Sequence, residues 1–282
     1  FLNSVRKEFP EAQVSASAIR YDGRTTRVRP YPIGIDYAGY RALSEKESLK
    51  RRANQLRSKM HVQHIIVGVD RLDYTKGIMN RLLAFERFLE THPKFIGKVS
   101  FIQVASPTRS AITEYRDMKR EIEENVGRIN GRFQQPQWTP IIYINRSVPG
   151  DEIMMLYRIA DVAMVTPIID GMNLVAKEYV TVNDNGVLIL SEFAGASEEM
   201  NQAIIVNPYD VDSMSAAIKK ALSMTSEERA RHIALLRGIV KEHDIFWWLN
   251  TFLEDWGVEL GEGEPAELRL MAGTEPSRRS RP

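Results

Sequence analysis

The chain has 282 residues, 43% of them hydrophobic and 27% charged, which is typical of a soluble globular protein with one or two domains. Its 38 basic and 37 acidic side chains nearly balance, so the charge gives no reason to expect nucleic acid or a membrane surface as a partner. Cysteine is absent, which excludes disulfides, thiolate zinc sites and a cysteine nucleophile and fits a reducing, cytoplasmic compartment, and no apolar run approaches the roughly 20 residues of a membrane span.

The first part of the chain predicts a small antiparallel unit followed by a helix. Weakly alternating residues 14–21 and 25–31 are separated by Asp22 and Gly23, a pair typical of a hairpin turn. Ser44 and Glu47 then have the spacing of a capping box, which predicts a charged helix that runs to about Met60.

Short apolar runs alternate with helical patterns from residue 64 onward. We expect strands near residues 64–69, 99–104, 140–144, 161–166, 187–190 and 203–207. This alternation predicts an α/β fold with a Rossmann-like, doubly wound parallel sheet that carries helices on both faces. Ligands of such sheets bind at the carboxyl ends of the strands.

Helical periodicity predicts core positions between the second and third strands. A single buried face is expected from Ile112, Tyr115, Met118, Ile122 and Val126. Further helices are expected at residues 211–222, at 226–242 and, with aromatic side chains, from 246 to about 256. Residues 257–282 contain little apolar content and are predicted to be a disordered tail.

Residues 170–178 connect the apolar strand at 162–165 to a helix through Gly171. Backbone N–H groups near residues 171–173 are expected to be unpaired at the start of that helix, which suits a phosphate. Asp170 and Glu178 flank the turn as carboxylates that suit sugar or ribose hydroxyls. The same stretch is compatible with a packing loop in which Asp170 is an N-cap and Lys177 and Glu178 lie on a solvated face.

A second strand, at residues 65–69, leads into a loop at 70–77 that carries two cations. Arg71 and Lys76 lie five positions apart just before a new helix. Cations held on a strand-to-helix loop can neutralise a leaving diphosphate, although a pair of surface cations is the simpler interpretation of this loop alone.

Together the two loops resemble those of the trehalose-6-phosphate synthases, a family of retaining sugar-nucleotide glycosyltransferases. Further matching strings follow in the family's order at residues 105–109, 127–131, 138–140, 165–167 and 191–196. The resemblance implies the C-terminal half of a two-domain glycosyltransferase of the B fold type. Residues 1–42 would be a remnant of the N-terminal acceptor domain, 43–242 the donor-binding domain and 243–256 a crossing helix.

The resemblance also implies roles for individual residues. Arg71 and Lys76 would be catalytic and hold the donor diphosphate, Glu178 would accept the ribose hydroxyls, and Asp170 would accept a glucose hydroxyl. Arg109 would bind the phosphate of the acceptor. The implied donor site consists of Arg71, Lys76, Val104, Val148, Asp170, Gly171, Met172, Asn173, Leu174 and Glu178.

The implied reaction transfers glucose from UDP-glucose to glucose 6-phosphate with retention, without a cofactor or bound metal ion, and gives trehalose 6-phosphate and UDP. Ile169 and Val148 depart from the family's usual residues, so a GDP or ADP sugar stays open as the donor. Two alternatives remain for the function, a non-catalytic nucleotide-sugar-binding module and a glucosylglycerol-phosphate synthase. A homo-oligomer is compatible with the sequence.

Overall fold

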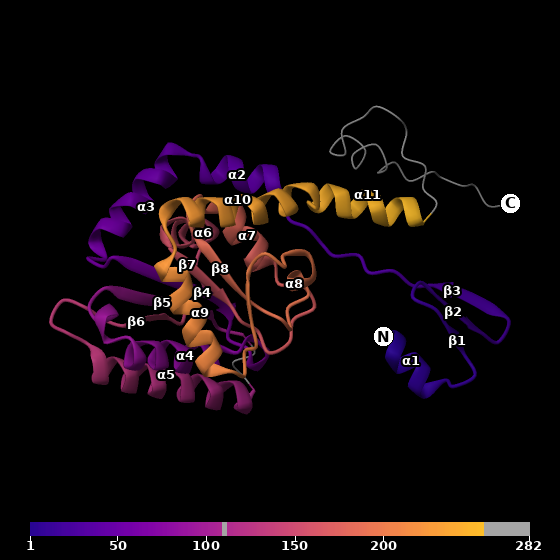
Figure 1. Cartoon of the computed structure of the whole chain (residues 1–282), viewed down its shortest axis with the longest axis horizontal. Coiled ribbons are helices and arrows are strands. Elements are labelled where there is room, and N and C mark those ends of the chain that lie inside the picture. The colour runs from indigo at the N-terminus through magenta and orange to yellow at the C-terminus, as the bar shows by residue number, and fades with distance from the viewer. Residues whose placement is uncertain (109–111, 257–282) are drawn as a thin grey trace, which may run out of the picture.

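A computed structural model describes residues 1–108 and 112–256 of the chain. Its main body is built on a six-stranded parallel sheet with the order β6-β5-β4-β7-β8-β9 (Figure 1). The strands are β4 (His64–Arg71), β5 (Val99–Ser106), β6 (Ile141–Ile144), β7 (Val162–Val165), β8 (Val187–Ser191) and β9 (Ile204–Val206). The chain builds outward from β4 to β6 and then returns to the other side of β4 with β7. The expected doubly wound sheet is therefore confirmed, and its order reverses between β4 and β7.

Helices cover both faces of this sheet. One face carries α2 (Tyr37–Ser44), α3 (Glu47–Lys59), α6 (Gly150–Ile159), α7 (Leu174–Val182) and α10 (Ser226–Glu242), and the other carries α4 (Ile78–Thr91), α5 (Thr113–Phe133) and α9 (Val211–Ser223). Successive strand side chains point to opposite faces, so Ile65 and Val67 join the first core cluster while Ile66 joins the second. Short turns of helix complete the body as η1 (Tyr74–Lys76), η2 (Pro93–Phe95) and α8 (Ala196–Glu199).

The core face predicted for α5 is correct except at its first position. Tyr115, Ile122 and Val126 are buried, and Met118 is partly buried against the same cluster. Ile112 is 44% exposed. It is the N-cap residue of α5 with extended backbone angles, so it does not follow the helical spiral of the others.

The capping box predicted at Ser44 is wrong, although the helix after it exists. Ser44 is the last residue of α2, where its buried hydroxyl donates to the Arg41 carbonyl at 2.8 Å. Lys46 takes the N-cap position of α3 without a side-chain hydrogen bond. Asp36 caps α2 by accepting from the N–H of Gly39 at 2.8 Å. The domain boundary expected after residue 42 falls inside α2, which ends at Ser44.

The N-terminal segment lies away from the sheet, beside the far end of α11 (Ile245–Asp255) (Figure 1). It contains α1 (Leu2–Glu8), β1 (Gln13–Val14), and the expected hairpin as β2 (Ala18–Tyr21) and β3 (Arg24–Arg27). The side chains of Arg29 and Tyr31 both donate to Asp255 at 2.8 Å, which ties the segment to α11. The tail expected at residues 257–282 lies outside the described residues.

None of the described helices is long and apolar enough to cross a membrane. Within residues 1–108 and 112–256, no group of three or more His, Asp or Glu side chains is arranged to hold a metal ion.

Candidate active site

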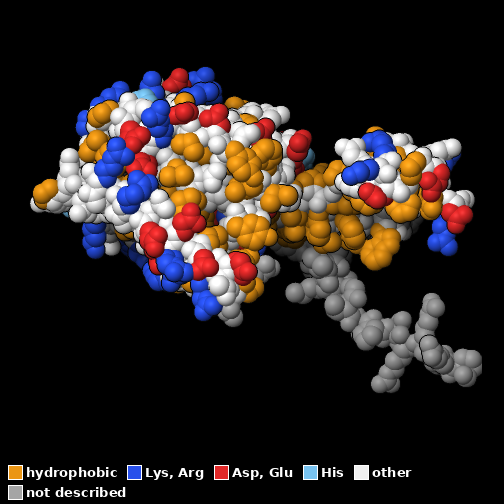
Figure 2. Space-filling view, turned by 90° about the horizontal axis from the view of Figure 1, so that it is seen from below, with side chains coloured by type: hydrophobic (Ala, Val, Ile, Leu, Met, Phe, Trp, Pro, Cys, Tyr) orange, Lys and Arg blue, Asp and Glu red, His pale blue; other side chains and the backbone are white. Residues whose placement is uncertain are grey.

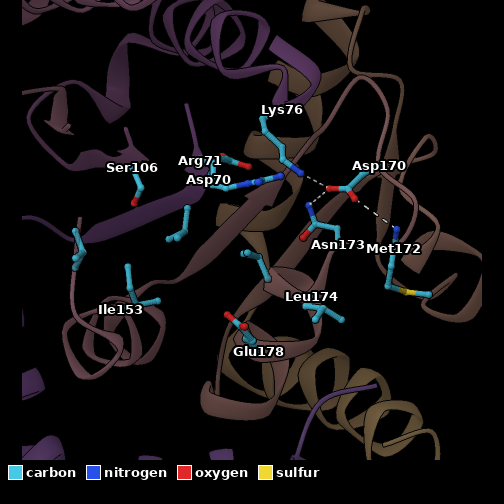
Figure 3. Close-up of a pocket in the computed structure, with 13 residues that line it drawn as sticks. Asp70, Arg71, Lys76, Ser106, Ile153, Asp170, Met172, Asn173, Leu174 and Glu178 are labelled. Atoms are coloured by element: carbon cyan, nitrogen blue, oxygen red, sulfur yellow. Dashed lines mark hydrogen bonds and ion pairs between the residues drawn. The ribbon is translucent and has the colours of Figure 1, made fainter. Parts of the chain in front are cut away.

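A pocket of about 510 Å³ lies at the carboxyl edge of the sheet, where its strand order reverses between β4 and β7 (Figure 3). Ligands of doubly wound sheets bind at this position because the loops diverge there. The predicted residues that line the pocket are Arg71, Lys76, Val148, Asp170, Met172, Asn173, Leu174 and Glu178. Its wall also includes residues that the sequence did not single out, such as Asp70, Ser106 and Ile153.

The loop after β4 is shaped so that Lys76 reaches the pocket. Asp73 is the N-cap residue of η1 and accepts from the backbone N–H and the hydroxyl of Thr75 at 3.0 and 2.8 Å. Burial tends to raise the pKa of Asp73, but these hydrogen bonds and the nearby cations outweigh burial and lower the pKa. Gly77 then turns into α4 with φ +62°, and a Cβ there would lie 2.5 Å from the Thr166 carbonyl oxygen. Glycine is therefore required at this turn.

Asp170 connects the two loops of the pocket. Its Oδ2 forms an ion pair with the Lys76 Nζ at 2.6 Å and accepts from the Asn173 Nδ2 at 3.0 Å (Figure 3). Asn173 has a left-handed backbone with φ 77°, and its Oδ1 caps α7 by accepting from the N–H of Ala176. The N-cap residue of α7 is thus Asn173 and not Asp170. The Asp170 carboxylate instead holds the Lys76 ammonium at the pocket wall.

The backbone around Gly171 is only partly available to a ligand. The N–H of Met172 faces the Asp170 Oδ1 at 3.4 Å, so the expectation that it is free is wrong. The carbonyls of Asp170 and Met172 accept from the N–H groups of Gly195 and Ala196 at 3.0 and 2.8 Å. Gly171 itself is exposed beside the pocket and is not among the residues of its wall.

Glu178 is held by two phenols from other helices. Its Oε1 accepts from the Tyr40 hydroxyl of α2 at 3.0 Å, and its Oε2 accepts from the Tyr157 hydroxyl of α6 at 2.9 Å. Burial, followed by the charge of Glu178, raises the pKa of both tyrosines. The phenols therefore stay protonated and donate to the carboxylate.

A buried polar network supports the pocket from beneath. Arg81 of α4 has no exposed surface and donates to Asp70 at 2.6 Å and to Gln103 at 3.0 Å. Its guanidinium also donates to the Thr166 hydroxyl at 3.0 Å and to the Lys76 carbonyl at 3.1 Å. Arg81 therefore links β4, β5, the end of β7 and the loop that carries Lys76.

Not every residue predicted for the site is found in the pocket wall that the structure describes. Val104 is fully buried in the core and is not part of the pocket wall, because its side chain points from β5 into the helical layer. Arg109 lies outside the described residues. The solvated face considered for Lys177 is wrong, because its side chain is 2% exposed and pairs with Glu199 at 2.7 Å.

Sequence reasoning missed Tyr40, Tyr157 and Arg81. Each belongs to a helix whose pattern indicates only packing or a solvated cation, and each meets its partner through tertiary contacts. Tyr40 and Glu178 are 138 positions apart, so no local motif could connect them.

The fold and pocket define an α/β protein that presents cations and carboxylates at the switch point of a parallel sheet. The chain belongs to glycosyltransferase family 20, whose family model matches residues 1–257. It is 41% identical over 257 residues to an α,α-trehalose-phosphate synthase [UDP-forming] of Candida albicans, with 90% of this chain and 54% of that protein covered.

Two solved structures are also similar. One is an α,α-trehalose-phosphate synthase (UDP-forming) from Burkholderia xenovorans in complex with glucose-6-phosphate, with a TM-score of 0.82 and 40% identity over 87% of this chain and 55% of that one. The other, described as trehalose-6-phosphate from E. coli bound with UDP-2-fluoro glucose, has a TM-score of 0.83 and 38% identity over 88% and 56%. The chain thus spans about half the length of these relatives.

Proposed function

We propose that this chain is the donor-binding part of a UDP-forming α,α-trehalose-phosphate synthase. The reaction transfers glucose from UDP-glucose to glucose 6-phosphate with retention and releases trehalose 6-phosphate and UDP. The observation that carries this proposal is one pocket, in a family 20 chain, that joins Arg71 and Lys76 to Asp170 and Glu178. Support also comes from the similar structures, which are described with glucose-6-phosphate and with UDP-2-fluoro glucose.

Arg71 and Lys76 bind the donor diphosphate in this proposal. Negative charge grows on the leaving phosphate as the glycosidic bond breaks, so cations fixed beside it stabilise the transition state more than the ground state. The Lys76 ammonium has three N–H donors, of which one is directed at Asp170, and the others remain for phosphate oxygens. Arg71 is exposed at the pocket and forms no ion pair with any residue that the structure describes.

The rest of the pocket suits the sugar and the nucleoside. Glu178 accepts ribose hydroxyls, while Asp170 accepts a glucose hydroxyl. Leu174, Val148 and Ile153 contribute apolar wall against which a nucleobase packs. Arg109 is proposed to reach the acceptor phosphate, for which a planar guanidinium is suited. Retention is explained by a front-face reaction in which the leaving phosphate helps to deprotonate the incoming hydroxyl.

Domain organisation follows the same proposal. We assign α2 to the donor-binding unit, because Tyr40 and Arg41 bond to Glu178 and to the Thr181 carbonyl of α7 at 3.0 Å each. That unit then extends from about residue 37 to 242, and residues 243–256 form the crossing helix.

Calorimetric titration of this chain with UDP, GDP and ADP tests the proposal. We expect saturable binding of UDP. Arg71→Ala and Lys76→Ala should each weaken UDP binding about tenfold or more, because a hydrogen bond to a charged group contributes about 1.5–3 kcal/mol. Arg87→Ala is the matched control, since Arg87 is a half-exposed cation of α4 that pairs with Asp212 away from the pocket.

Three outcomes of this titration would contradict parts of the proposal. Unchanged UDP affinity in both pocket variants would show that the diphosphate binds elsewhere. Preference for GDP or ADP would correct the donor. A folded chain that binds none of the nucleotides would favour a different role for this pocket.

A further inference from the structure

Three helices converge on the Glu178 carboxylate. Glu178 itself belongs to α7, Tyr40 to α2 and Tyr157 to α6. Each phenol donates to a different carboxylate oxygen, at 3.0 Å from Tyr40 and at 2.9 Å from Tyr157. The carboxylate plane is therefore fixed by two bonds, and neither rotation of the group nor exchange of its oxygens is possible without breaking both.

The two phenols differ in how firmly they are themselves held. Tyr157 is 1% exposed and lies in the core cluster, where its ring meets the ring of Tyr179 edge to face at 6.2 Å. Tyr40 is half-buried and packs against the same cluster from α2. The core packing thus fixes Tyr157 in place, and Tyr40 binds the other oxygen of the Glu178 carboxylate from a less buried position.

The clamped carboxylate still has acceptor capacity. An ionised carboxylate has about four lone-pair sites, and the two phenols occupy one on each oxygen. One site therefore remains on each oxygen, and Glu178 lines the pocket. Two acceptors on one fixed plane match two neighbouring hydroxyl donors, which is the arrangement of the ribose 2′ and 3′ hydroxyls.

We propose that Tyr40 and Tyr157 are positioning residues that fix Glu178 for a vicinal diol, so that the site selects ribonucleotides over 2′-deoxyribonucleotides. This inference rests on the proposed function, because it places the ribose of the donor at Glu178. A site built to pair with a hydroxyl rejects the analogue that lacks it, since its own polar group is then left unpaired. A mobile carboxylate discriminates less, because it can turn to another partner.

Isosteric Tyr→Phe substitutions test the proposal with UDP and 2′-deoxy-UDP as probes. We expect the unmodified chain to bind UDP about tenfold or more tightly than 2′-deoxy-UDP in calorimetry. Tyr157→Phe and Tyr40→Phe should each weaken UDP binding and affect 2′-deoxy-UDP much less, so that the ratio of the two dissociation constants falls to about threefold or below.

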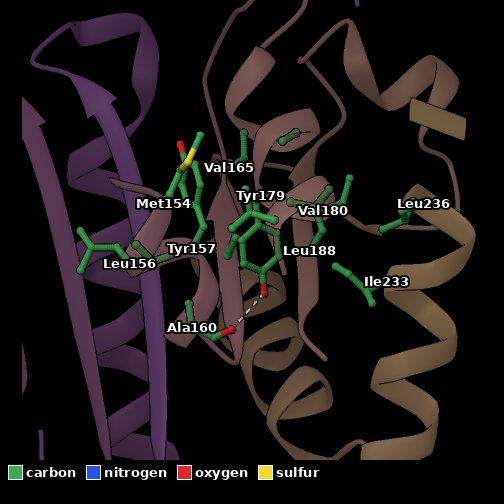
Figure 4. Close-up of a cluster of buried hydrophobic side chains, with 14 of the residues drawn as sticks. Met154, Leu156, Tyr157, Ala160, Val165, Tyr179, Val180, Leu188, Ile233 and Leu236 are labelled. Carbon is green, nitrogen blue, oxygen red and sulfur yellow. Dashed lines mark hydrogen bonds between the residues drawn. The ribbon is translucent and has the colours of Figure 1, made fainter. Parts of the chain in front are cut away.

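Tyr179→Phe is the matched control. Tyr179 is fully buried on the same helix as Glu178, but its hydroxyl donates to the Ala160 carbonyl at 3.3 Å and not to the carboxylate (Figure 4). This variant should keep the ratio of the unmodified chain even if it is less stable. Circular dichroism shows whether each variant folds. If Tyr157→Phe does not fold, Tyr40→Phe still tests the proposal, because Tyr40 is only half-buried.

The outcomes separate this inference from the proposed function. No UDP binding by the folded, unmodified chain would overturn the proposed function. Binding of UDP with no preference over 2′-deoxy-UDP, or a ratio that Tyr157→Phe and Tyr40→Phe leave unchanged, would overturn the inference alone. A ratio that falls equally in Tyr179→Phe would also overturn it, because loss of any buried hydroxyl would then have the same effect.

Discussion

Arg81 is a fully buried cation that is paired with a buried carboxylate. Its side chain has no exposed surface, and Asp70, with a side chain 3% exposed, is its ion-pair partner at 2.6 Å. Loss of one partner of such a pair costs about 3–5 kcal/mol, because the other charge stays buried without compensation. We expect Arg81→Met to lower the free energy of unfolding by about that amount in urea titration. It should also weaken UDP binding, because the Lys76 carbonyl loses a donor.

Arg87→Met, on the same helix, controls for the loss of an arginine. Arg87 is 46% exposed and pairs with Asp212 on the surface, so its removal should change the free energy of unfolding by at most about 1 kcal/mol. Equal effects of the two variants would show that the buried pair contributes no more than a surface pair.

His232 shows how a single contact joins two elements. It lies on α10, and its Nε2 accepts from the Leu188 N–H of β8 at 3.2 Å, which requires an unprotonated nitrogen. Burial, assisted by the charge of Lys220, lowers the pKa of His232 below 6.5. The unfolded chain then binds a proton more readily than the folded chain, so the free energy of unfolding should fall as the pH drops below about 6.5.

Comparison of the unmodified chain with His232→Gln isolates this effect. Glutamine keeps an acceptor oxygen but does not titrate, so urea titrations between pH 7.5 and 5.5 should show a smaller loss of stability in the variant. His64 also has a pKa lowered by burial and contributes a decline of the same sign in both proteins. Identical pH dependence in the two would show that His232 is protonated equally in the folded and unfolded chains.

Burial of whole elements decides how much of the fold could be predicted from the sequence. Strands such as β4 and β8 are buried on both faces, so continuous apolar runs mark them plainly. The loops with Arg71 and Asp170 directly follow such strands, so the sequence predicts their position at the carboxyl edge of the sheet. The capping box predicted at Ser44 is wrong because the spacing from Ser44 to Glu47 suits a cap locally, whereas in the folded chain Ser44 is the last residue of α2. The partners of Glu178 could not be found, because three helices meet there only after folding.

Two segments far apart in the sequence, residues 33–35 and 243–245, cross beside the sheet and connect the ends of the described chain to its main body. The carbonyl of Ile35 accepts from the N–H of Ile245 at 2.9 Å, and the Ile33 carbonyl accepts from the buried Lys177 at 3.0 Å. Beyond this crossing, hydrophobic side chains gather over α11 (Figure 2), which has no buried residue, and its C-cap residue Trp256 is 75% exposed. The crossing therefore holds α11, and through Asp255 the N-terminal segment, against the body built on the six-stranded sheet.

Gly34 makes this crossing possible, because a Cβ there would lie 2.3 Å from the backbone carbon of Asp244 and 2.5 Å from its oxygen. Backbone atoms cannot move aside as a side chain can, so Gly34→Ala should separate the segments and lower the free energy of unfolding by about 1–3 kcal/mol. Amide hydrogen exchange at Ile245 should accelerate, since its acceptor is the Ile35 carbonyl. Gly238→Ala, with nothing within 4 Å inside α10, should instead stabilise by about 0.5–1 kcal/mol. Unchanged exchange at Ile245 in Gly34→Ala would show that the crossing tolerates the added methyl.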